Sequence, residues 1–476
     1  MADVTSIRAS LDHPVIDADG HWLEYWPVVG EFMKKVGGEA AARATAIGGK
    51  SVRNSLTMTV AERRRRNVPQ EAFWGAPTRN TLDRATAMMP QLLYERLDEI
   101  GIDFAVMYPT GGLGIPRVHD DEARLAGCRA FNTYCAETFN PFSDRMTPAA
   151  VIPMHTPDEA IEVLEHAVGE LGLKAVYMNS LIERPIEEPA PELIANGGYW
   201  FDVLGLDSAY DYDPVWEKCR ELNVSPSFHK GSRGRALRIS PSNFTYNHIG
   251  HFAAAGEAVC KALFLGGVTR RFPDLNFAFL EGGVGFACLL FADLIGHWHV
   301  RSNEGLEYTN PANLDVAMLE DLAEKYAGAE MAQAIKAGKG VTTASGPETT
   351  GQLDELDDYS RCGITSAADI KSLFADRFYF GCEADDPSNA WAFNEAHNPL
   401  NARLNALYGS DIGHFDVRDM NDVLPEAYEL VEDGNITDYD FADFVFNNAV
   451  RFWGETNPDF FTGTKVEAAA RKVLAG

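Results

Sequence analysis

Short apolar runs alternate with helical stretches along this chain. Eight of these runs have the β-rich composition of strands, and each leads through a polar or glycine-rich turn into a stretch of helical period. The runs cover residues 15–19, 103–108, 146–153, 174–178, 225–229, 276–281, 377–381 and 406–411. Residues 158–171 illustrate the helical pattern, because their apolar positions recur at intervals of three and four behind an acidic start.

Eight strands, each followed by a helix, predict an α/β fold of the (β/α)8 TIM-barrel type. The spacing between the runs is uneven, so we assign insertions at about residues 27–95 and 300–372. Residues 438–474 have a helical pattern, and we expect this C-terminal tail to pack back on the barrel. We therefore interpret residues 1–476 as a single barrel domain with helical insertions.

Composition and charge exclude several partners. The 476 residues are 46% apolar, enough for a large core, and carry a formal net charge of −29. Such an acidic chain is disfavoured at nucleic acids and at anionic membrane surfaces. No apolar run approaches the roughly 18 residues of a membrane span, and the N-terminus lacks the apolar core of a signal peptide. We therefore expect a cytoplasmic protein.

The cysteines and arginines exclude further kinds of site. The seven cysteines include no Cys-x-x-Cys spacing, which predicts neither a disulfide framework nor a thiolate zinc site. Any metal would therefore be held by histidines and carboxylates. The four consecutive arginines at 63–66 are interpreted as a solvated helix face or an oligomer contact rather than a nucleic-acid site, because the chain as a whole is acidic.

The stretch from Asp17 to Glu24, Asp-Ala-Asp-Gly-His-Trp-Leu-Glu, brings three carboxylates and one imidazole together. In a strand that continues this far, Asp17, Asp19 and His21 point to one side, so that two of them could bind one cation. The alternative is an Asx turn that caps the next element. The residues at the other strand ends distinguish the two interpretations.

Catalytic groups of a TIM barrel sit at the carboxyl ends of its strands. Metal-ligand residue types occur at five of the eight predicted ends: Asp19 and His21, His229, Glu281, the group Glu383, Asp385 and Asp386, and Asp411. A random distribution would not place ligand types at so many ends. We therefore predict a metal site at the mouth of the barrel, with Asp17 in a supporting role.

This pattern resembles the amidohydrolase superfamily, and within it the amidohydrolase-2 branch that includes the aminocarboxymuconate-semialdehyde and resorcylate decarboxylases. The resemblance rests on Val-Ile-Asp-Ala-Asp-Gly-His at 15–21, on His229, on Arg-Phe-Pro-Asp-Leu-Asn-Phe-Ala-Phe-Leu-Glu-Gly-Gly at 271–283 and on Tyr-Gly-Ser-Asp at 408–411. It implies a metal-dependent barrel enzyme. In it, His21 and His229 are ligands, and Asp411 both binds metal and handles the proton of a water.

The chain departs from the family pattern at two places. Asp19 stands where the first histidine of a His-x-His pair is usual, and Glu281 stands where a histidine base is usual. Both changes replace nitrogen by charged oxygen, which favours Mn or Fe over zinc. With Glu24 and Asp411, four carboxylates could face the site, and two divalent ions would relieve the cost of burying them. We predict two Fe or Mn ions, with Zn as the alternative.

Three more histidines are candidates for this site. His251, after the fifth strand, could bind the second ion, as could His248, and packing roles are the alternatives. His414 is a candidate ligand or proton carrier, with a structural role as the alternative. Together with Glu281 and Asp411, it is a candidate catalytic residue.

Basic residues near the same mouth could bind substrate. Lys230, Arg233 and Arg235 follow the fifth strand, and an arginine can hold a carboxylate through two parallel hydrogen bonds. The alternative is that these residues only neutralise an acidic surface.

Two reaction classes compete for the proposed centre. The oxygen-rich ligand set favours a dinuclear Fe/Mn centre that activates O2 and hydroxylates a small organic substrate such as an amino acid. In this respect the chain resembles the larger component of a 2-aminoisobutyrate hydroxylase. The alternative is a metal-dependent hydrolase or non-oxidative decarboxylase that acts on a small amide or carboxylate through a metal-bound water.

A third interpretation is a catalytically silent subunit that partners an active paralogue. We expect oligomerisation in each case, as a homo-oligomer or as a hetero-oligomer with a paralogous subunit of the amidohydrolase fold, since barrels with long helical insertions often associate.

Overall fold

The computed structural model describes residues 3–70, 79–186, 198–229, 239–342, 357–360 and 362–476, without the side chains of 46–56, 303 and 304. Eight strands form one parallel sheet in the order β1-β2-β3-β4-β7-β8-β9-β10. They are β1 (Ile16–Trp22), β2 (Phe104–Pro109), β3 (Met146–Ile152), β4 (Ala175–Met178), β7 (Pro226–Phe228), β8 (Phe277–Phe279), β9 (Phe378–Glu383) and β10 (Asn405–Gly409). Each predicted run overlaps one of these strands, so the predicted barrel is confirmed.

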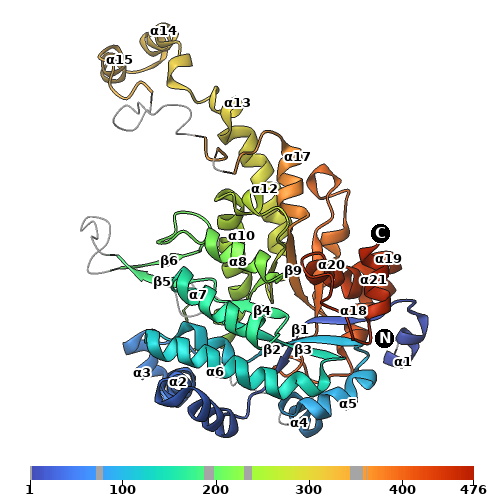
Figure 1. The fold of residues 1–476 in the computed structure, drawn as a ribbon. Coiled ribbons are helices and arrows are strands. Elements are labelled where there is room, and N and C mark those ends of the chain that lie inside the picture. The colour runs from blue at the N-terminus through green and yellow to red at the C-terminus, as the bar shows by residue number, and fades with distance from the viewer. Residues whose placement is uncertain (1–2, 71–78, 187–197, 230–238, 343–356, 361) are drawn as a thin grey trace.

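The sheet curls until its first and last strands meet (Figure 1). The backbone N–H of Asp411 donates to the carbonyl of Asp19 at 3.2 Å, and the N–H of His21 donates to the carbonyl of Ile412 at 3.1 Å. These bonds join the end of β1 to the segment after β10 and nearly close the barrel. They also bring residues almost four hundred positions apart in the sequence to the same point.

Helices surround the barrel on its outside (Figure 1). The structure describes these helices: α1 (Val4–Ser10), α2 (Trp26–Thr57), α3 (Val60–Arg66), α4 (Thr81–Met88), α5 (Pro90–Ile100), α6 (Asp121–Phe139), α7 (Pro157–Leu164), α8 (Asp213–Glu221), α9 (Phe244–His248), α10 (His251–Leu265), α11 (Val268–Arg271), α12 (Gly285–Arg301), α13 (Asn303–Leu306), α14 (Val316–Tyr326), α15 (Ala329–Lys336), α17 (Ala367–Ile370), α18 (Val423–Glu432), α19 (Asp438–Ala442), α20 (Asn448–Gly454) and α21 (Glu467–Leu474). A separate antiparallel hairpin pairs β5 (Ile182–Pro185) with β6 (Tyr199–Asp202).

Burial on both faces explains the apolar composition of the strands. Every residue of β1 and β2 is buried. In β2 these residues are mainly apolar, but β1 carries Asp17, Asp19 and His21 into the interior. Buried polar groups are costly without partners, so these three side chains need partners inside the barrel.

One helical segment lies away from the barrel. α12 starts beside it, whereas α13, α14 and α15 stand at its far end (Figure 1). α14 and α15 pack mainly on each other. This segment belongs to the stretch that the sequence predicts as the second insertion.

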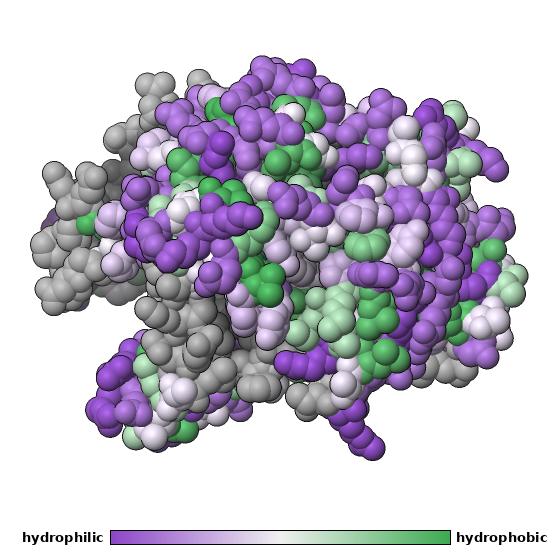
Figure 2. Space-filling model, turned by 60° about the horizontal axis from the view of Figure 1, so that its bottom comes forward, coloured by the Kyte–Doolittle hydropathy of each residue, from purple (hydrophilic) through white to green (hydrophobic). Residues whose placement is uncertain are grey.

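The surface agrees with the acidic composition. The face in Figure 2 is mostly hydrophilic, interrupted by smaller hydrophobic patches. Among the helices that the structure describes, none has the length and apolar character to cross a bilayer.

Candidate metal centre

A bulge in β1 shapes the first part of the site. Asp17 pairs with Ala105 and Gly20 with Met107, so β1 holds one residue more than β2 between these points. A Cβ on Gly20 would lie 2.5 Å from Asp17 Oδ2, so only glycine fits there. The glycine of the Asp-Ala-Asp-Gly-His motif is therefore a requirement of the bulged strand.

Asp17 is used to hold the barrel together. Its carboxylate accepts hydrogen bonds from Ser410 Oγ at 2.5 Å, from the Ser410 N–H at 3.0 Å and from the Asp19 N–H at 3.2 Å. Burial raises the pKa of Asp17 to about 6 in spite of these bonds. Asp17 thus links β1 to the end of β10 and fixes the residues on either side.

Asp19, His21 and His229 converge from β1 and from the end of β7. The two Nε2 atoms of His21 and His229 lie 3.0 Å apart. Asp19 Oδ1 lies 3.4 Å from His21 Nε2 and 3.5 Å from His229 Nε2. All three residues are buried. They form the first of two overlapping groups that could hold a metal ion.

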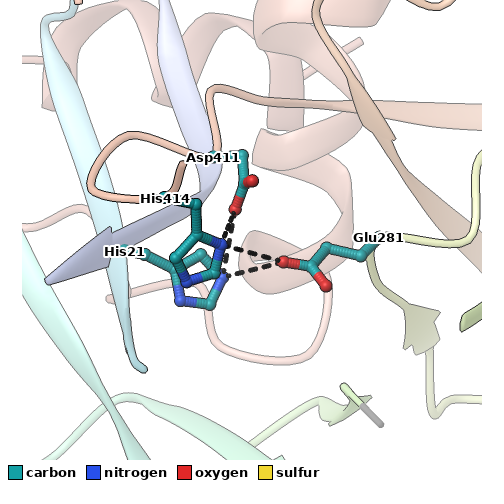
Figure 3. Close-up of side chains that lie close together, drawn as sticks. All are labelled: His21, Glu281, Asp411 and His414. Atoms are coloured by element: carbon teal, nitrogen blue, oxygen red, sulfur yellow. Dashed lines mark ion pairs between the residues drawn. The ribbon is translucent and has the colours of Figure 1, made fainter. Parts of the chain in front are cut away.

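Glu281, Asp411 and His414 join His21 in the second group (Figure 3). Glu281 Oε1 lies 3.4 Å from His21 Nε2, 3.5 Å from His229 Nε2 and 3.5 Å from His414 Nδ1. Asp411 Oδ1 lies 2.5 Å from His414 Nδ1 and 3.7 Å from His21 Nε2. Six side chains from the ends of four strands therefore meet at one place, which we call the six-residue cluster.

The spacing of these atoms fits a divalent cation. Ligand bonds of about 2.1 Å separate neighbouring ligand atoms by about 3.0 Å at right angles and about 3.4 Å in a tetrahedron. The separations around Asp19, His21 and His229 run from 3.0 to 3.5 Å. Asp19 Oδ1 is also buried without a hydrogen-bond partner among the described residues. A cation between these atoms would satisfy it.

The electrostatics point the same way. Burial opposes ionisation of Glu281, but the charge of His229 and hydrogen bonds from His21, His229 and His414 hold its pKa well below the usual range. For Asp411, burial and the charge of Glu281 raise the pKa well above the usual range. Without a cation the cluster therefore favours a proton on Asp411, and a divalent ion would compete with that proton.

The backbone at two of these carboxylates is strained. Glu281 has φ 55° and Asp411 has φ 50°, in the left-handed region that residues other than glycine seldom adopt. Such conformations cost of order 1–3 kcal/mol each and are concentrated at functional sites. Here the strain directs both carboxylates at the cluster.

Thr110, at the end of β2, fixes the orientation of His414. Its hydroxyl donates to the carbonyl of Trp22 at 3.0 Å and lies 3.1 Å from His414 Nε2. Because the single hydroxyl hydrogen goes to Trp22, the threonine oxygen accepts from His414 Nε2–H. The Nδ1 atom then faces Glu281 and Asp411, where it can bind a cation. Thr110 was not among the residues predicted from the sequence, although its place at a strand end is a signal for it.

Two of the predicted ligands lie outside the six-residue cluster. Glu24 accepts hydrogen bonds from the N–H groups of Gly111 at 2.8 Å and Gly112 at 2.6 Å. His251 is buried at the start of α10, with its ring centroid 4.9 Å from that of His248. The structure thus brings together Asp19, His21, His229, Glu281, Asp411 and His414, and it places Glu24, His248 and His251 beside them. Lys230, Arg233 and Arg235 lie outside the described residues.

A cavity of about 310 Å³ opens beside the cluster. Its lining includes Glu281 itself, His251, Glu383 at the end of β9, and Asp416. Burial, followed by the charges of Glu281 and Asp416, raises the pKa of Glu383 to about 8. This side chain therefore holds a proton at neutral pH next to the space that a substrate would fill. Glu383 was predicted from the sequence only as a ligand-type residue at a strand end.

Comparison with known proteins finds a matching family and solved structures of similar fold. The amidohydrolase family model, of the amidohydrolase-2 type, matches residues 16–326. An amidohydrolase from Mycobacterium avium subsp. paratuberculosis K-10 has a similar fold, with 16% sequence identity and a TM-score of 0.52 over 94% of this chain and 100% of that chain. A dihydroxybenzoic acid decarboxylase from Polaromonas sp. JS666, solved with manganese and the inhibitor 2-nitroresorcinol, has 14% identity and a TM-score of 0.50 over 94% and 99% of the two chains.

Proposed function

We propose that this chain, which belongs to the amidohydrolase family, is a divalent-metal enzyme that acts on a small organic substrate as a hydrolase or a non-oxidative decarboxylase. The observation that carries the proposal is the six-residue cluster. Three imidazoles and three carboxylates meet there at separations of ligand atoms around a cation.

The six side chains of the cluster would hold the metal. When bound, a divalent ion polarises a substrate oxygen or lowers the pKa of a water so that the water is a nucleophile at neutral pH. We assign proton acceptance to Asp411, whose carboxylate lies among the ligand groups at the end of β10, 2.5 Å from His414 Nδ1.

Proton donation falls to a second residue. Glu383 holds a proton at neutral pH at the edge of the cavity and can deliver it to a leaving amine or to the carbon that loses CO2. A carboxyl kept neutral by burial is suited to this role. Manganese in the decarboxylase from Polaromonas supports Mn as a cofactor here, alongside Fe or Zn.

A second candidate function is O2-dependent hydroxylation at a dinuclear Fe/Mn centre, the reaction that the sequence favours. The specific observation for it is the position of Glu281 Oε1, which lies 3.5 Å from both His229 Nε2 and His414 Nδ1. Glu281 would then help to hold two ions, together with His229 and His414. The excess of oxygen ligands is also suited to Fe and Mn.

Metal reconstitution tests both functions. We would strip the purified protein with a chelator and reload it with Mn²⁺, Fe²⁺ or Zn²⁺. Metal content would be measured by mass spectrometry, and CO2 release from hydroxybenzoates, hydrolysis of small amides and O2 uptake with small amino acids would be followed. The proposal expects metal-dependent CO2 release or hydrolysis without O2 uptake. Two ions per chain with amino-acid-dependent O2 uptake would support the second candidate instead.

A matched pair of variants tests whether the metal binds at the cluster. His21→Ala removes the residue shared by both ligand groups, whereas His297→Ala removes an exposed histidine of α12. We expect the first variant to lose bound metal and activity and the second to retain both, with circular dichroism as the check on folding. Equal metal content in the two variants would refute the proposed site.

A further inference from the structure

α14 presents an apolar stripe to solvent. Met318, Leu322 and Tyr326 follow one another at intervals of four residues, which places them along one side of the helix. Their exposed fractions are 58%, 43% and 72%. We call these three residues the α14 stripe. Three large apolar side chains in a row are unlike the isolated exposed apolar residues of an ordinary surface.

The helix already uses another face within its own chain. Ala323 of α14 and Ile335 of α15 are buried, at 6% and 8% exposure, and the two helices pack on each other. Ala323 is adjacent in sequence to Leu322, so its side chain points about 100° away from the stripe. α14 therefore has two apolar faces. A helix with two apolar faces is typical of one packed on two sides.

The α14–α15 pair needs such a second contact. The helices have 11 and 8 residues, and isolated helices shorter than about 12–15 residues are marginal in water. The pair stands away from the barrel (Figure 1), so the barrel core does not support it. Packing against a further surface would stabilise both helices.

We propose that the α14 stripe is a homodimer interface, in which α14 of one copy packs antiparallel on α14 of a second copy. A two-fold axis lets one patch serve both subunits, so the stripe needs no other complementary surface. In this arrangement Met318 of each copy faces Leu322 of the other. The proposal is independent of the reaction at the barrel mouth.

The charges at the two ends of the stripe favour the antiparallel direction. Asp315 caps the N-terminus of α14, where its side chain accepts from the Met318 N–H at 2.9 Å. Lys325 lies in the last turn, with its Nζ 5.0 Å from the centroid of the Tyr326 ring. An antiparallel pair brings the acidic end of one helix to the basic end of the other and also opposes the two helix dipoles. A parallel pair would place like charges together.

The mass in solution tests the interface. The chain has a mass of 52.3 kDa, and we expect the full-length protein to have twice that mass by light scattering at micromolar concentration. Leu322→Glu would place a charge on each side of the contact and should raise the dimer dissociation constant at least about thirtyfold. Leu82→Glu, at a site on α4 that is 52% exposed, is the matched control and should stay dimeric.

A cross-linking experiment tests the direction. Met318→Cys and Leu322→Cys proteins, mixed and oxidised, should form a disulfide with each other more readily than either forms with itself. Self-cross-linking of each variant in preference to the mixed product would overturn the antiparallel arrangement. A monomeric wild-type protein at 100 μM, or a Leu322→Glu dimer as tight as that of Leu82→Glu, would overturn the interface itself. Metal content and circular dichroism should be unchanged in every variant, which separates this result from loss of the fold or of the metal centre.

Discussion

The barrel mouth and the α14 stripe depart from the usual distribution of residues in opposite ways. At the mouth, the carboxyl side chains of Asp19, Glu281 and Asp411 are buried. On α14, apolar Met318 and Tyr326 are exposed. Both arrangements are costly for an isolated chain. Each cost is relieved by a binding partner of matching chemistry, a cation in the first case and a second copy of the chain in the second.

The two regions differ in how they are built. The mouth collects side chains from the ends of β1, β7, β8 and β10, so it exists only when the whole barrel is folded. The α14 stripe comes from three turns of one helix. Changes at one region should therefore leave the other unaffected, and five measurements can break or sharpen this separation.

The largest effect is expected for Glu281→Gln. Glu281 Oε1 lies within 3.5 Å of His21, His229 and His414, so the change removes a negative charge that contacts three imidazoles. Even loss of a partner outside the ligand sphere costs about 10–100-fold in metal affinity, so we expect a loss of at least about a hundredfold. Competition with a chromogenic chelator measures it. Glu24→Gln is the comparison, because the structure holds Glu24 on backbone amides, and a similar loss there would restore it as a ligand.

Metal removal should lower the free energy of unfolding. An ion that binds only the folded state at a hundred times its dissociation constant raises the free energy of unfolding by about 2.7 kcal/mol. Urea denaturation with and without chelator measures this difference. The same difference should appear in Leu322→Glu, since the stripe lies apart from the mouth. A smaller difference in that variant would mean that the two regions are coupled.

Thr110→Val should weaken the centre through His414. Valine keeps the shape of threonine but cannot accept from His414 Nε2–H, so the ring loses its fixed orientation. We expect metal affinity to fall about 10–100-fold. Thr110→Ser retains the hydroxyl and should restore most of it. If serine and valine were equally poor, the role of Thr110 would be packing rather than orientation.

Part of the metal centre could be predicted from the sequence, and part could not. The barrel could be predicted, and all six cluster residues could be named as candidates, because the carboxyl ends of parallel strands share one edge and Asp19, His21 and Asp411 stand at such ends. The role of Thr110 could not, because it depends on which acceptor takes one hydroxyl hydrogen. The position of Glu24 could not be predicted either, because two backbone amides of a loop bind its carboxylate.

The helical segment of α13, α14 and α15 shows a similar limit. The sequence marked residues 300–372 as an insertion, and the helical pattern of α14 is visible in it. The pattern does not say which of two apolar faces packs within the chain. The inner face is known only from the fold, in which Ala323 is buried and α14 packs on α15.

The free energy of unfolding should rise by about 1.4 kcal/mol for a tenfold rise in protein concentration. When a dimer unfolds to separate chains, a tenfold rise in concentration favours the folded dimer by about this amount. Thermal melts of the wild type at two concentrations should therefore differ. The melts of Leu322→Glu should coincide. Coincident wild-type melts would show that the stripe is not coupled to global unfolding, and would confine its effect to the α14–α15 pair.

The pH dependence of stability tests the protonation of Glu383. Its pKa is about 8 in the folded protein, against about 4.3 in an unfolded chain. Between these values the folded state keeps a proton that the unfolded state has released, so the free energy of unfolding falls as pH rises from about 4 to about 8. Glu383→Gln stays neutral throughout and should flatten this decline in metal-free protein, as measured by urea denaturation at several pH values. Tyr326→Ser, on the α14 stripe, should leave the slope as it is in the wild type, because it removes no titrating group in this range. A slope unchanged by Glu383→Gln would mean that Glu383 ionises near its ordinary pKa and is no proton donor at neutral pH, leaving the buried carboxylates of the cluster to account for the pH response of the mouth.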